Sequence, residues 1–590
     1  MNEALTAFIE THFKEPVTDG EDKRCTPEQA IAQHIKKQMA LYVPCGAALL
    51  NPLIRAFWGQ RPEFTLISTG ITLQLHAMLH GGLAKKAITS FAGHTYPSPR
   101  PCKVVQKAFR AGTVEFENWS IRTIVQRLLA AAIGLDFLPT RSLIGSSMAE
   151  ENKADFKVID TPFGGGGQIG LVKALRPDVA LVHAAAADRS GNAIFTYPLI
   201  GDAFGAWAAR KGVIVSTEKI VSSDYIRRHA HMVRIPSRAV LAVCEAPFGL
   251  HPYGVTQHGL TDYEGANFAD YAFQTELMEA TRTEEDFSAW IDEWILGCRN
   301  HDEYLAKLGS RRLLYLRGMT ASDAWKTEIA SESRQVDFTA PPNKLEKLVV
   351  AGSRAIAERC LQNGYDALLA GIGLANLCAW LGRHALEARG HAIDLLAEIG
   401  MVGHFPRPSD PTAFSFHHMH SCKLMSNIET TLGYLVGGPS SRCLGVLGAG
   451  QIDCYGNANS TKIPGAAYLV GSGGANDVAA SSRESVVVMN AGKSRLVPEV
   501  PYVTFPGEKI RTLVTDAGVF VKGEGRDRFT LTAYIPSEDG QSEEECLRSI
   551  KGKVGWKLET VPGLRKIAPP TKEELTLLRL FDPRGFFLGM

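Results

Sequence analysis

Several features that would place this 590-residue chain in a functional class are missing from its sequence. Its 63 basic residues are balanced by 62 acidic ones, so the total charge offers no attraction to nucleic acid or to an anionic membrane. No apolar run has the length of a membrane span, and residues 1–25 lack the apolar core of a signal peptide. We therefore expect a soluble cytoplasmic protein without a nucleic-acid or membrane partner.

Metal-binding and disulfide patterns are also missing. The 11 cysteines are scattered and include no Cys-x-x-Cys pair, which argues against a disulfide framework and a structural zinc site. The segment FHHMHSC contains His417, His418, His420 and Cys422, which together suggest a metal site. Ligands crowded into one short segment rarely complete a tetrahedral site alone, and no second ligand set stands out. We predict that no residue of this chain is a metal ligand.

The common nucleotide and hydrolase motifs are incomplete or absent. There is no GxxxxGK[ST] loop and no Gly-x-Ser-x-Gly elbow. Gly371 and Gly373 follow a strand-like segment and precede a helical one, with acids about 20 residues later, as in a dinucleotide fingerprint. Asn376 stands where the third glycine of that fingerprint belongs, so nucleotide binding is a weak alternative.

Two segments of the chain resemble each other. ALVHAAAADRSGNA (180–193) and LGAGQIDCYGNANS (447–460) both follow an apolar run with Asp-x-x-Gly-Asn-Ala, at 188–193 and 453–458. The alternative is two unrelated turns, because these residue types favour turns anywhere. A second similarity argues for a true repeat: the expected helix at 51–58 with a strand at 64–70 corresponds to a helix at 374–388 with a strand at 392–400.

The order strand, helix, strand in both halves predicts βαβ units. We expect an α/β fold with two related domains, each an open, mainly parallel sheet flanked by helices. Between the halves lies a charged, helix-rich region at 264–316, followed by a segment at 333–347 whose two prolines suit a linker. The predicted domains are therefore 1–340, with a helical C-terminal extension, and 341–590.

A glycine-rich segment, VGSGGANDVAASS at 470–482, is a candidate binding loop. Successive small residues allow backbone N–H groups to approach a ligand closely, and donors aimed at one point stabilise an oxyanion or a phosphate. The candidate residues are Gly471, Gly473, Gly474, Ala475 and Asn476. The alternative is a flexible surface loop, but the small residues that continue after it favour a packed, functional loop.

These segments together resemble one protein family. The segments are 450–461 and 471–482 (GQIDCYGNANST and GSGGANDVAASS), 176–193 (RPDVALVHAAAADRSGNA) and 117–142 (ENWSIRTIVQRLLAAAIGLDFLPTRS). They resemble the two subunits of family I CoA-transferases of the glutaconate type, a line that includes hydrolases of cyclic acyl-CoA compounds in steroid ring degradation. The first half is similar to the α subunit and the second to the β subunit, joined in one chain.

The resemblance implies a catalytic glutamate. In the family, a β-subunit glutamate in a short Glu-Ser-Gly or Glu-Asn-Gly turn after a strand is the nucleophile. Glu398, Ile399 and Gly400 match that turn, with isoleucine replacing the small polar residue. The implied reaction moves CoA from an acyl-CoA to a carboxylic acid through a glutamyl-CoA thioester on Glu398, with the glycine loop holding the oxyanion. CoA is then a substrate, and the reaction requires no cofactor and no metal.

Two departures from the family pattern bear on this expectation. Ile399 makes the turn more apolar, which raises the pKa of a carboxylate and weakens it as a nucleophile. The glycines at 164–167 form a run that is richer in glycine than is usual at that place, which would reshape the acyl pocket.

The resemblance also leaves a hydrolase as an alternative. In the ring-hydrolase relatives an acid of the α subunit helps in place of the β nucleophile, and Glu117 in ENWS is the candidate here. Water would then be activated by Glu398 or Glu117. Glu117 is also explained as an acid favoured near a helix N-terminus. A third alternative is a CoA-binding or assembly protein without activity, against which the presence of both Glu398 and the glycine loop argues.

The acyl group cannot be read from the residues. Arg127 and Arg141 could meet the distal carboxylate of a dicarboxylic substrate, but surface ion pairing explains them equally well. In this family pairs of such chains are common, so a homodimer or higher homo-oligomer is expected.

Overall fold

The computed structural model describes residues 2–43, 46–163, 166–199, 201–260, 262–536, 538 and 540–589, with the side chain of Asp202 left out. Gly164 and Gly165 of the glycine run at 164–167 lie outside these residues.

The helices of the described chain are spread over both halves. They are α1 (Glu3–His12), α2 (Pro27–His34), α3 (Ala47–Phe57), α4 (Leu75–His80), α5 (Lys103–Ala111), α6 (Ile121–Ala132), α7 (Ser147–Glu151), α8 (Asp202–Ala208), α9 (Ser223–Arg228), α10 (Tyr271–Ala280), α11 (Glu284–Ile291), α12 (His301–Leu308), α13 (Ser310–Gly318), α14 (Ala324–Glu332), α15 (Lys344–Asn363), α16 (Leu374–Glu387), α17 (Phe416–Met419), α18 (Ala475–Ser481), α19 (Glu543–Lys553) and α20 (Lys572–Phe581).

The strands are short in most cases. Those of the first half are β1 (Ala40–Tyr42), β2 (Phe64–Ser68), β3 (Ala84–Thr89), β4 (Glu115–Asn118), β5 (Phe137–Thr140), β6 (Phe156–Asp160), β7 (Gln168–Lys173), β8 (Val179–Asp188), β9 (Ala193–Ile194), β10 (Gly212–Val221), β11 (Val233–Ile235) and β12 (Val240–Glu245). Those of the second half are β13 (Ala367–Ala370), β14 (Asp394–Ala397), β15 (Met401–Val402), β16 (Leu424–Met425), β17 (Cys443–Leu447), β18 (Gln451–Ile452), β19 (Ala458–Asn459), β20 (Lys462–Ile463), β21 (Ala467–Tyr468), β22 (Glu484–Val488), β23 (Ile510–Val514), β24 (Gly518–Val521), β25 (Thr530–Tyr534) and β26 (Thr560–Lys566).

Two large open sheets organise the molecule, one in each half. The first has the order β11-β9-β8-β1-β2-β3-β4, with β10 pairing β8 and β12. Among its described strands, the pairs β8–β9 and β9–β11 are antiparallel and the others are parallel. The second has the order β16-β15-β14-β13-β17-β22-β23-β24-β25-β26, with a parallel centre and antiparallel pairs towards its ends. The predicted α/β class with open, mainly parallel sheets is confirmed.

The predicted strand, helix, strand repeat is present in both halves. The first half has β1, α3 and β2, with β1 beside β8; the second has β13, α16 and β14, with β13 beside β17. The predicted helix at 374–388 agrees with α16 to within one residue. The predicted helix at 51–58 begins four residues earlier, at Ala47, because the Ala-Ala-Leu-Leu start favours helix and Pro52 is accommodated inside α3.

The repeated Asp-x-x-Gly-Asn pattern forms the same turn twice. In the first half one carboxylate oxygen of Asp188 accepts the backbone N–H groups of Ser190, Gly191 and Asn192 at 3.1, 2.9 and 2.9 Å. In the second half, Asp453 accepts the N–H of Tyr455 at 2.9 Å and of Asn457 at 3.0 Å. In both turns the asparagine amide donates back to the aspartate. The sequence similarity therefore reflects common structure.

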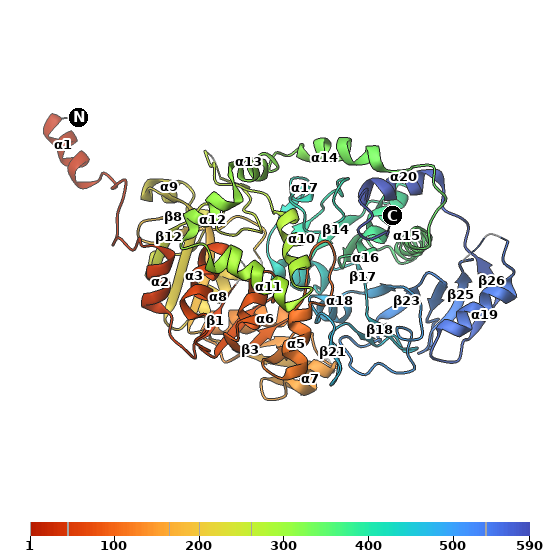
Figure 1. The fold of residues 1–590 in the computed structure, drawn as a ribbon. Helices are drawn as coiled ribbons and strands as arrows, with labels where there is room; N and C mark the ends of the chain where they lie inside the picture. The colour runs from red at the N-terminus through yellow and green to blue at the C-terminus, as the bar shows by residue number, and fades with distance from the viewer. Residues whose placement is uncertain are drawn as a thin grey trace.

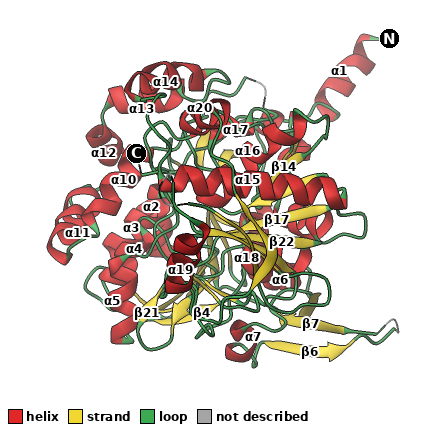
Figure 2. Cartoon of the chain, turned by 90° about the vertical axis from the view of Figure 1, so that its right-hand side faces the viewer, coloured by secondary structure: helices red, strands yellow, loops and turns green. Residues whose placement is uncertain are grey.

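The two halves are packed together rather than strung apart. Figure 1 shows the first half and the second half side by side, with α13 and α14 running over the top between them and α1 projecting away from the body. On one face of the second sheet lie α15 and α16. On the other face, Ile121 and Val125 of α6 enter the same apolar cluster as Val478 of α18 and Leu369 of β13, and Figure 2 shows α6 and α18 below that sheet, opposite α15.

The segment that joins the halves is held by the C-terminal helix. Arg579 of α20 is buried and binds Glu346 of α15 through both carboxylate oxygens, at 2.6 and 3.1 Å. Its Nη1 donates to the backbone carbonyl of Asp337, and its Nη2, which also binds Glu346, donates to the carbonyl of Ala340. Thr571 and Glu574 form a capping box at the start of α20. The domain boundary near residue 340 stays a prediction.

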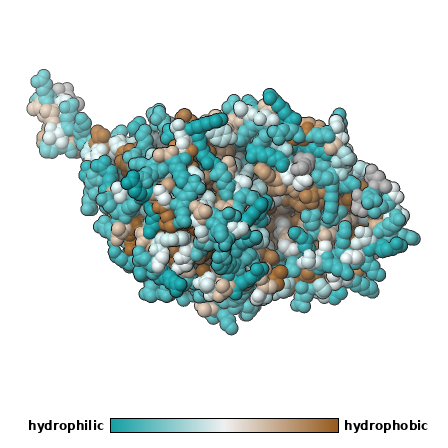
Figure 3. Space-filling view, viewed as in Figure 1, coloured by the Kyte–Doolittle hydropathy of each residue, from teal (hydrophilic) through white to brown (hydrophobic). Residues whose placement is uncertain are grey.

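The visible face of the molecule is mainly hydrophilic, with apolar residues in small groups (Figure 3). Among the described residues, none of the helices combines the length and the apolar character that crossing a bilayer requires.

We expect Asp188→Ala to destabilise the protein by about 3 kcal/mol, because the change leaves buried N–H groups without their acceptor. Asp188 is fully buried. Asp337→Ala is the matched control, since Asp337 accepts the Thr339 N–H at 2.8 Å in an exposed turn. Thermal unfolding followed by circular dichroism compares the two variants. Equal midpoints would show that burial of the Asp188 turn adds nothing to stability.

Candidate functional site

Glu398 stands at the carboxyl end of the parallel strand β14. Residues 398–400 form a tight turn that returns the chain antiparallel as β15, closed by a 3.0 Å hydrogen bond from the Gly400 N–H to the Ala397 carbonyl. Gly400 has φ +115°, and a Cβ on it would lie 2.3 Å from the carbonyl oxygen of Ser426. Only glycine therefore fits at position 400. The turn holds Glu398 at the edge where α/β sheets bind ligands.

The Glu398 carboxylate lies directly against the glycine loop. A Cβ added to Gly474 would lie 1.7 Å from Glu398 Oε2 and 2.9 Å from Glu398 Cδ. The space that a side chain at 474 would fill is thus occupied by the carboxylate. Glu398 and Gly474, 76 positions apart in the sequence, are brought together by the fold.

The carboxylate of Glu398 is partly exposed and unbonded: within the described chain, no hydrogen bond or ion pair reaches it. Burial, and then the negative charge of Asp477, raise the pKa of Glu398 to about 7. Ile399, whose side chain is buried in a small cluster with Met401 and Met419, contributes an apolar surrounding. A carboxylate without donors in such a place is poorly stabilised, so near neutral pH only part of Glu398 is in the ionised, nucleophilic form.

Asp477 is the second acid of the site, and it is held firmly. Its two carboxylate oxygens accept the hydroxyl of Ser120 at 2.6 Å and the backbone N–H of Arg122 at 3.0 Å. Burial raises the pKa of Asp477 to about 6, although these hydrogen bonds oppose the shift. Both partners belong to the first half, at the start of α6, so Asp477 anchors the second half's glycine loop to the first half.

The backbone of the glycine loop at 471–476 also bonds across the halves. The Gly473 N–H donates to the Ser90 carbonyl, and the Gly473 carbonyl accepts the Ile121 N–H, both at 2.9 Å. A Cβ on Gly471 would lie 2.3 Å from the Ser90 oxygen, so the strand-like approach of the two segments requires glycine there. The predicted packed loop is therefore observed, and the flexible surface loop is not.

Most of the loop's backbone donors are already used. The N–H groups donate as follows: Gly471 to Ser460 O (3.1 Å), Gly473 to Ser90 O (2.9 Å), Ala475 to Ser472 O (3.0 Å) and Asn476 to Ser472 Oγ (3.4 Å). Within the described part of the chain, the Gly474 N–H has no acceptor. Of the five residues predicted as donors, Gly474 alone keeps a backbone N–H for a ligand, and it is the one beside Glu398.

Asn476 has a structural position. Its side-chain oxygen accepts the Leu143 N–H at 2.8 Å, and its amide donates to the Thr504 carbonyl at 2.9 Å. Both bonds are buried. Asn476 therefore fixes the start of α18 to the loop after β5 and to the segment before β23.

Glu117 is engaged elsewhere. It binds Lys86 at 2.6 Å, Arg127 at 3.0 Å and the indole N–H of Trp119 at 2.7 Å. Burial by itself would raise its pKa, but the Lys86 hydrogen bond, the Arg127 charge and the Trp119 hydrogen bond lower the pKa of Glu117 below its ordinary value. Such a carboxylate is a weak base. Arg127 is likewise committed, since it also pairs with Asp155 at 3.1 Å and stacks on Trp119.

The weak dinucleotide fingerprint is explained by packing. The Asn376 side chain accepts the Gly373 N–H at 2.7 Å and donates to the Pro411 carbonyl at 3.0 Å, which caps the start of α16 internally. Asp394, one of the acids that would hold a ribose, pairs with Lys423 at 2.6 Å. Asn376 and Asp394 therefore bind other parts of the protein.

The histidines of FHHMHSC point to separate protein partners. His417 pairs with Glu328 at 2.9 Å, His418 accepts the Arg407 N–H at 3.0 Å, and His420 bonds the Thr320 carbonyl at 2.9 Å. Glu328 and Thr320 belong to the helical region before the linker. The segment therefore joins that region to the second half.

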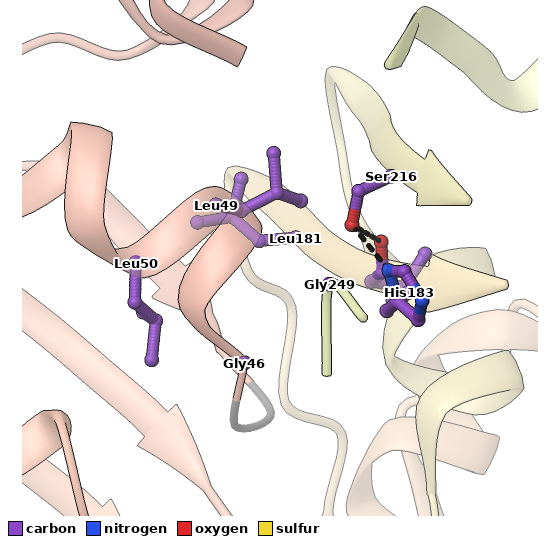
Figure 4. Close-up of a pocket in the computed structure, with 8 residues that line it drawn as sticks. Gly46, Leu49, Leu50, Leu181, His183, Ser216 and Gly249 are labelled. Atoms are coloured by element: carbon purple, nitrogen blue, oxygen red, sulfur yellow. Dashed lines mark hydrogen bonds between the residues drawn. The ribbon is translucent and has the colours of Figure 1, made fainter. Parts of the chain in front are cut away.

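A small pocket in the first half is lined by a histidine and a serine that bond each other. His183 of β8 bonds Ser216 of the neighbouring strand β10 at 2.8 Å, beside Leu49 and Gly249 (Figure 4). The other ring nitrogen of His183 bonds Glu218 of β10 at 2.9 Å. Glu218 also accepts the backbone N–H of Gly249 at 3.1 Å. Ser216 is buried at 1% exposure, so this chain of bonds pins the loop at Gly249 and offers no accessible nucleophile.

Asp477 is the site residue that the sequence did not reveal. It lies three positions after Gly474 in a stretch that otherwise reads as small and uncharged. The available signal was that one acid in the first turn of a buried helix. Ser90 and Ser120 were equally hidden, because they reach the site only through contacts between the halves.

Comparison with known proteins identifies the family of the chain. A model of the coenzyme A transferase family matches residues 24–246. One of the two subunits of the glutaconate CoA-transferase of Acidaminococcus fermentans is 36% identical over 226 residues, which cover 36% of this chain and 68% of its own length. The other of the two is 29% identical over 169 residues, which cover 25% of this chain and 60% of its own length.

A solved structure reproduces the whole arrangement. The acyl-CoA transferase of Escherichia coli O157:H7 superposes with a TM-score of 0.63 over 97% of this chain and 99% of its own, at 17% identity, which shows a shared fold. One chain is thus similar to both polypeptides of a two-subunit transferase. With two thirds of the first glutaconate CoA-transferase polypeptide matched at 36% identity, this chain belongs to the coenzyme A transferase family.

Proposed function

We propose that the chain transfers CoA from an acyl-CoA to a carboxylic acid, with Glu398 as the nucleophile and a glutamyl-CoA thioester as the intermediate. The observation that carries the proposal is the position of the Glu398 carboxylate, which takes the place of a side chain at Gly474 and has no hydrogen-bond partner among the described residues. Membership of the transferase family supports the reaction class.

The chemistry follows from a carboxylate facing a thioester. A Glu398 oxygen attacks the thioester carbonyl and the C–S bond breaks. CoA thiolate departs, and the acyl group stays bound to Glu398 as a mixed anhydride. The thiolate then attacks Glu398 Cδ, the bond from Cδ to the acyl oxygen breaks, and the donor acid departs as its carboxylate. The acceptor carboxylate repeats both steps in reverse and leaves as the new acyl-CoA. No electrons are exchanged with a cofactor, and CoA is a substrate.

Each tetrahedral intermediate places negative charge on an oxygen beside Glu398. The Gly474 N–H lies next to that carboxylate and donates to no described acceptor, so we assign it to this oxygen. The remaining loop N–H groups are bonded within the protein and hold this donor in place. Loss of one oxyanion donor typically costs about 3 kcal/mol of transition-state stabilisation.

Trapping the intermediate tests the proposal. Incubation with an acyl-CoA alone, without acceptor acid, is expected to leave CoA attached to the peptide that contains Glu398, as read by mass spectrometry. Glu398→Gln keeps the size of the side chain and removes the nucleophile, so we expect no adduct and a loss of transfer of at least about 1,000-fold.

The controls separate this proposal from its alternatives. Glu117→Gln is expected to retain the adduct, because Glu117 is bound to Lys86 and Arg127. Release of free acid from wild-type protein without an adduct would support a hydrolase and overturn the transfer mechanism. Neither an adduct nor free acid across acetyl-, succinyl-, glutaryl- and aromatic acyl-CoA would leave a binding protein as the better description.

Gly474→Ala is expected to reduce kcat/KM for transfer by at least about 100-fold, because the new methyl group must displace the carboxylate. The added Cβ would lie 1.7 Å from Glu398 Oε2. Gly492→Ala is the control, since a Cβ at that glycine meets nothing within 4 Å. Steady-state kinetics on both variants, with circular dichroism to confirm folding, gives the comparison. Full activity of folded Gly474→Ala would contradict the geometry.

The pH dependence follows from the raised pKa of Glu398. The attacking form is the carboxylate, and its pKa is about 7, so kcat/KM is expected to rise with pH and to level off above about 7. Measurements of kcat/KM from roughly pH 5 to 9 would give the midpoint of this rise. Asp477→Asn removes a neighbouring negative charge, so the pKa of Glu398 should fall and the midpoint of the rise in kcat/KM should move to lower pH. If the midpoint for the wild-type protein lay near pH 4.3, about the ordinary pKa of glutamate, it would contradict the described environment.

A further inference from the structure

Two histidines and a cysteine from separate segments meet in the interior of the first half. One ring nitrogen each of His76 and His94, together with the sulfur of Cys102, lie within 4.8 Å of one another. The three residues come from α4, from the loop after β3 and from the residue that precedes α5. His76 and Cys102 are completely buried and His94 is 8% exposed.

His76 lacks the partners that a buried imidazole requires. The side chain is fully buried, and neither ring nitrogen reaches hydrogen-bond geometry with a described residue, although the backbone of Ile71 and of Gly93 lies close to the ring. An unpaired buried polar group typically costs about 1 to 3 kcal/mol, so such a group calls for a partner.

The other two donors are also suited to a cation. His94 is oriented by a 3.1 Å hydrogen bond between its Nε2 and the hydroxyl of Thr281, the residue that follows α10, the kind of outer support that ligating histidines have. Burial lowers the pKa of His94, while the adjacent Cys102 thiol opposes that shift, which places the thiol beside the ring. Two neutral imidazoles and one thiol are the donor types that zinc prefers.

The geometry requires only a small contraction. Zn²⁺ binds nitrogen at about 2.0 Å and sulfur at about 2.3 Å, so tetrahedral donors lie about 3.3 to 3.6 Å apart. The observed upper separation of 4.8 Å must therefore shorten by about 1.2 to 1.5 Å, which requires the side chains to rotate when the metal binds. Water can complete the fourth position, as it does in many three-ligand zinc sites.

Contrary to the sequence prediction that no residue of this chain is a metal ligand, we propose that His76, His94 and Cys102 form a zinc site that stiffens the first half's side of the active site. His94 follows the segment at 90–93 that pairs with the glycine loop: Phe91 bridges Gly471, and the Ala92 N–H donates to the Val470 carbonyl at 2.8 Å. A metal joined to His94 would hold this segment against the second half. The site is separate from Glu398 and takes no part in the transfer steps.

Metal content and cobalt spectroscopy of the full-length protein test the site. We expect purified protein to hold about one zinc per chain by elemental analysis. After removal with a chelator, added Co²⁺ should give a thiolate-to-cobalt band in the near ultraviolet and strong visible bands of a tetrahedral ion. Both readouts use the unaltered chain, so they do not depend on whether a variant folds.

Paired variants assign the ligands. Cys102→Ser should lose the thiolate band, and Cys360→Ser, which alters an equally buried cysteine in α15, should keep it. His76→Gln should weaken Co²⁺ binding, while His404→Gln should not, because His404 is a buried histidine with two unpaired ring nitrogens outside this group. Wild-type protein without bound metal and without a cobalt thiolate band would overturn the proposal. A band that persists in Cys102→Ser would overturn it as well.

Discussion

The missing side chain at Gly474 is the constraint on which the rest of the site depends. The Glu398 carboxylate occupies the volume of that side chain, and a Cβ there would lie 1.7 Å from Oε2. Any other residue at 474 would separate the nucleophile from the adjacent backbone donor. The fold therefore brings an acid at the end of β14 against a glycine that comes 76 positions later in the sequence, and leaves the Gly474 N–H without a described acceptor.

Burying two acids beside the glycine loop is energetically unfavourable by itself, and the contacts between the halves offset this cost. Glu398 and Asp477 are two acids in a poorly solvated place, and burial raises the pKa of each. Asp477 is stabilised by Ser120 and by the backbone of Arg122, while the loop's own backbone is bonded to Ser90. The first half supplies all three of these partners. The unsatisfied acid is thus Glu398 alone, which agrees with the general finding that functional sites break rules that the surrounding structure obeys.

The two halves share a plan but differ in the chemistry they carry. Both have the strand, helix, strand unit. Both also have an aspartate, Asp188 or Asp453, whose carboxylate accepts backbone N–H groups of a turn that contains Gly-Asn. At the end of β2, where the second half has its acid, the first half has Thr69, whose carbonyl accepts the Ser90 hydroxyl at 2.5 Å. The first half therefore positions the loop that faces the nucleophile, and the second half provides the nucleophile.

The sequence by itself determined the features that depend on neighbours along the chain. Hydrophobic period and glycine placement were enough for the βαβ units, for helix α16 and its end, for the paired aspartate turns and for the acid after β14. The family resemblance then singled out Glu398 and the loop at 471–476. Only the tertiary structure decided which loop N–H stays free, that Glu117 and Arg127 neutralise each other, and that Asp477 sets the charge around Glu398. It also brought together His76, His94 and Cys102, whose spacing matches no ligand motif. The physical reason is the same in each case: hydrogen bonds, desolvation and charge act through space, and the partners involved lie dozens to hundreds of residues apart.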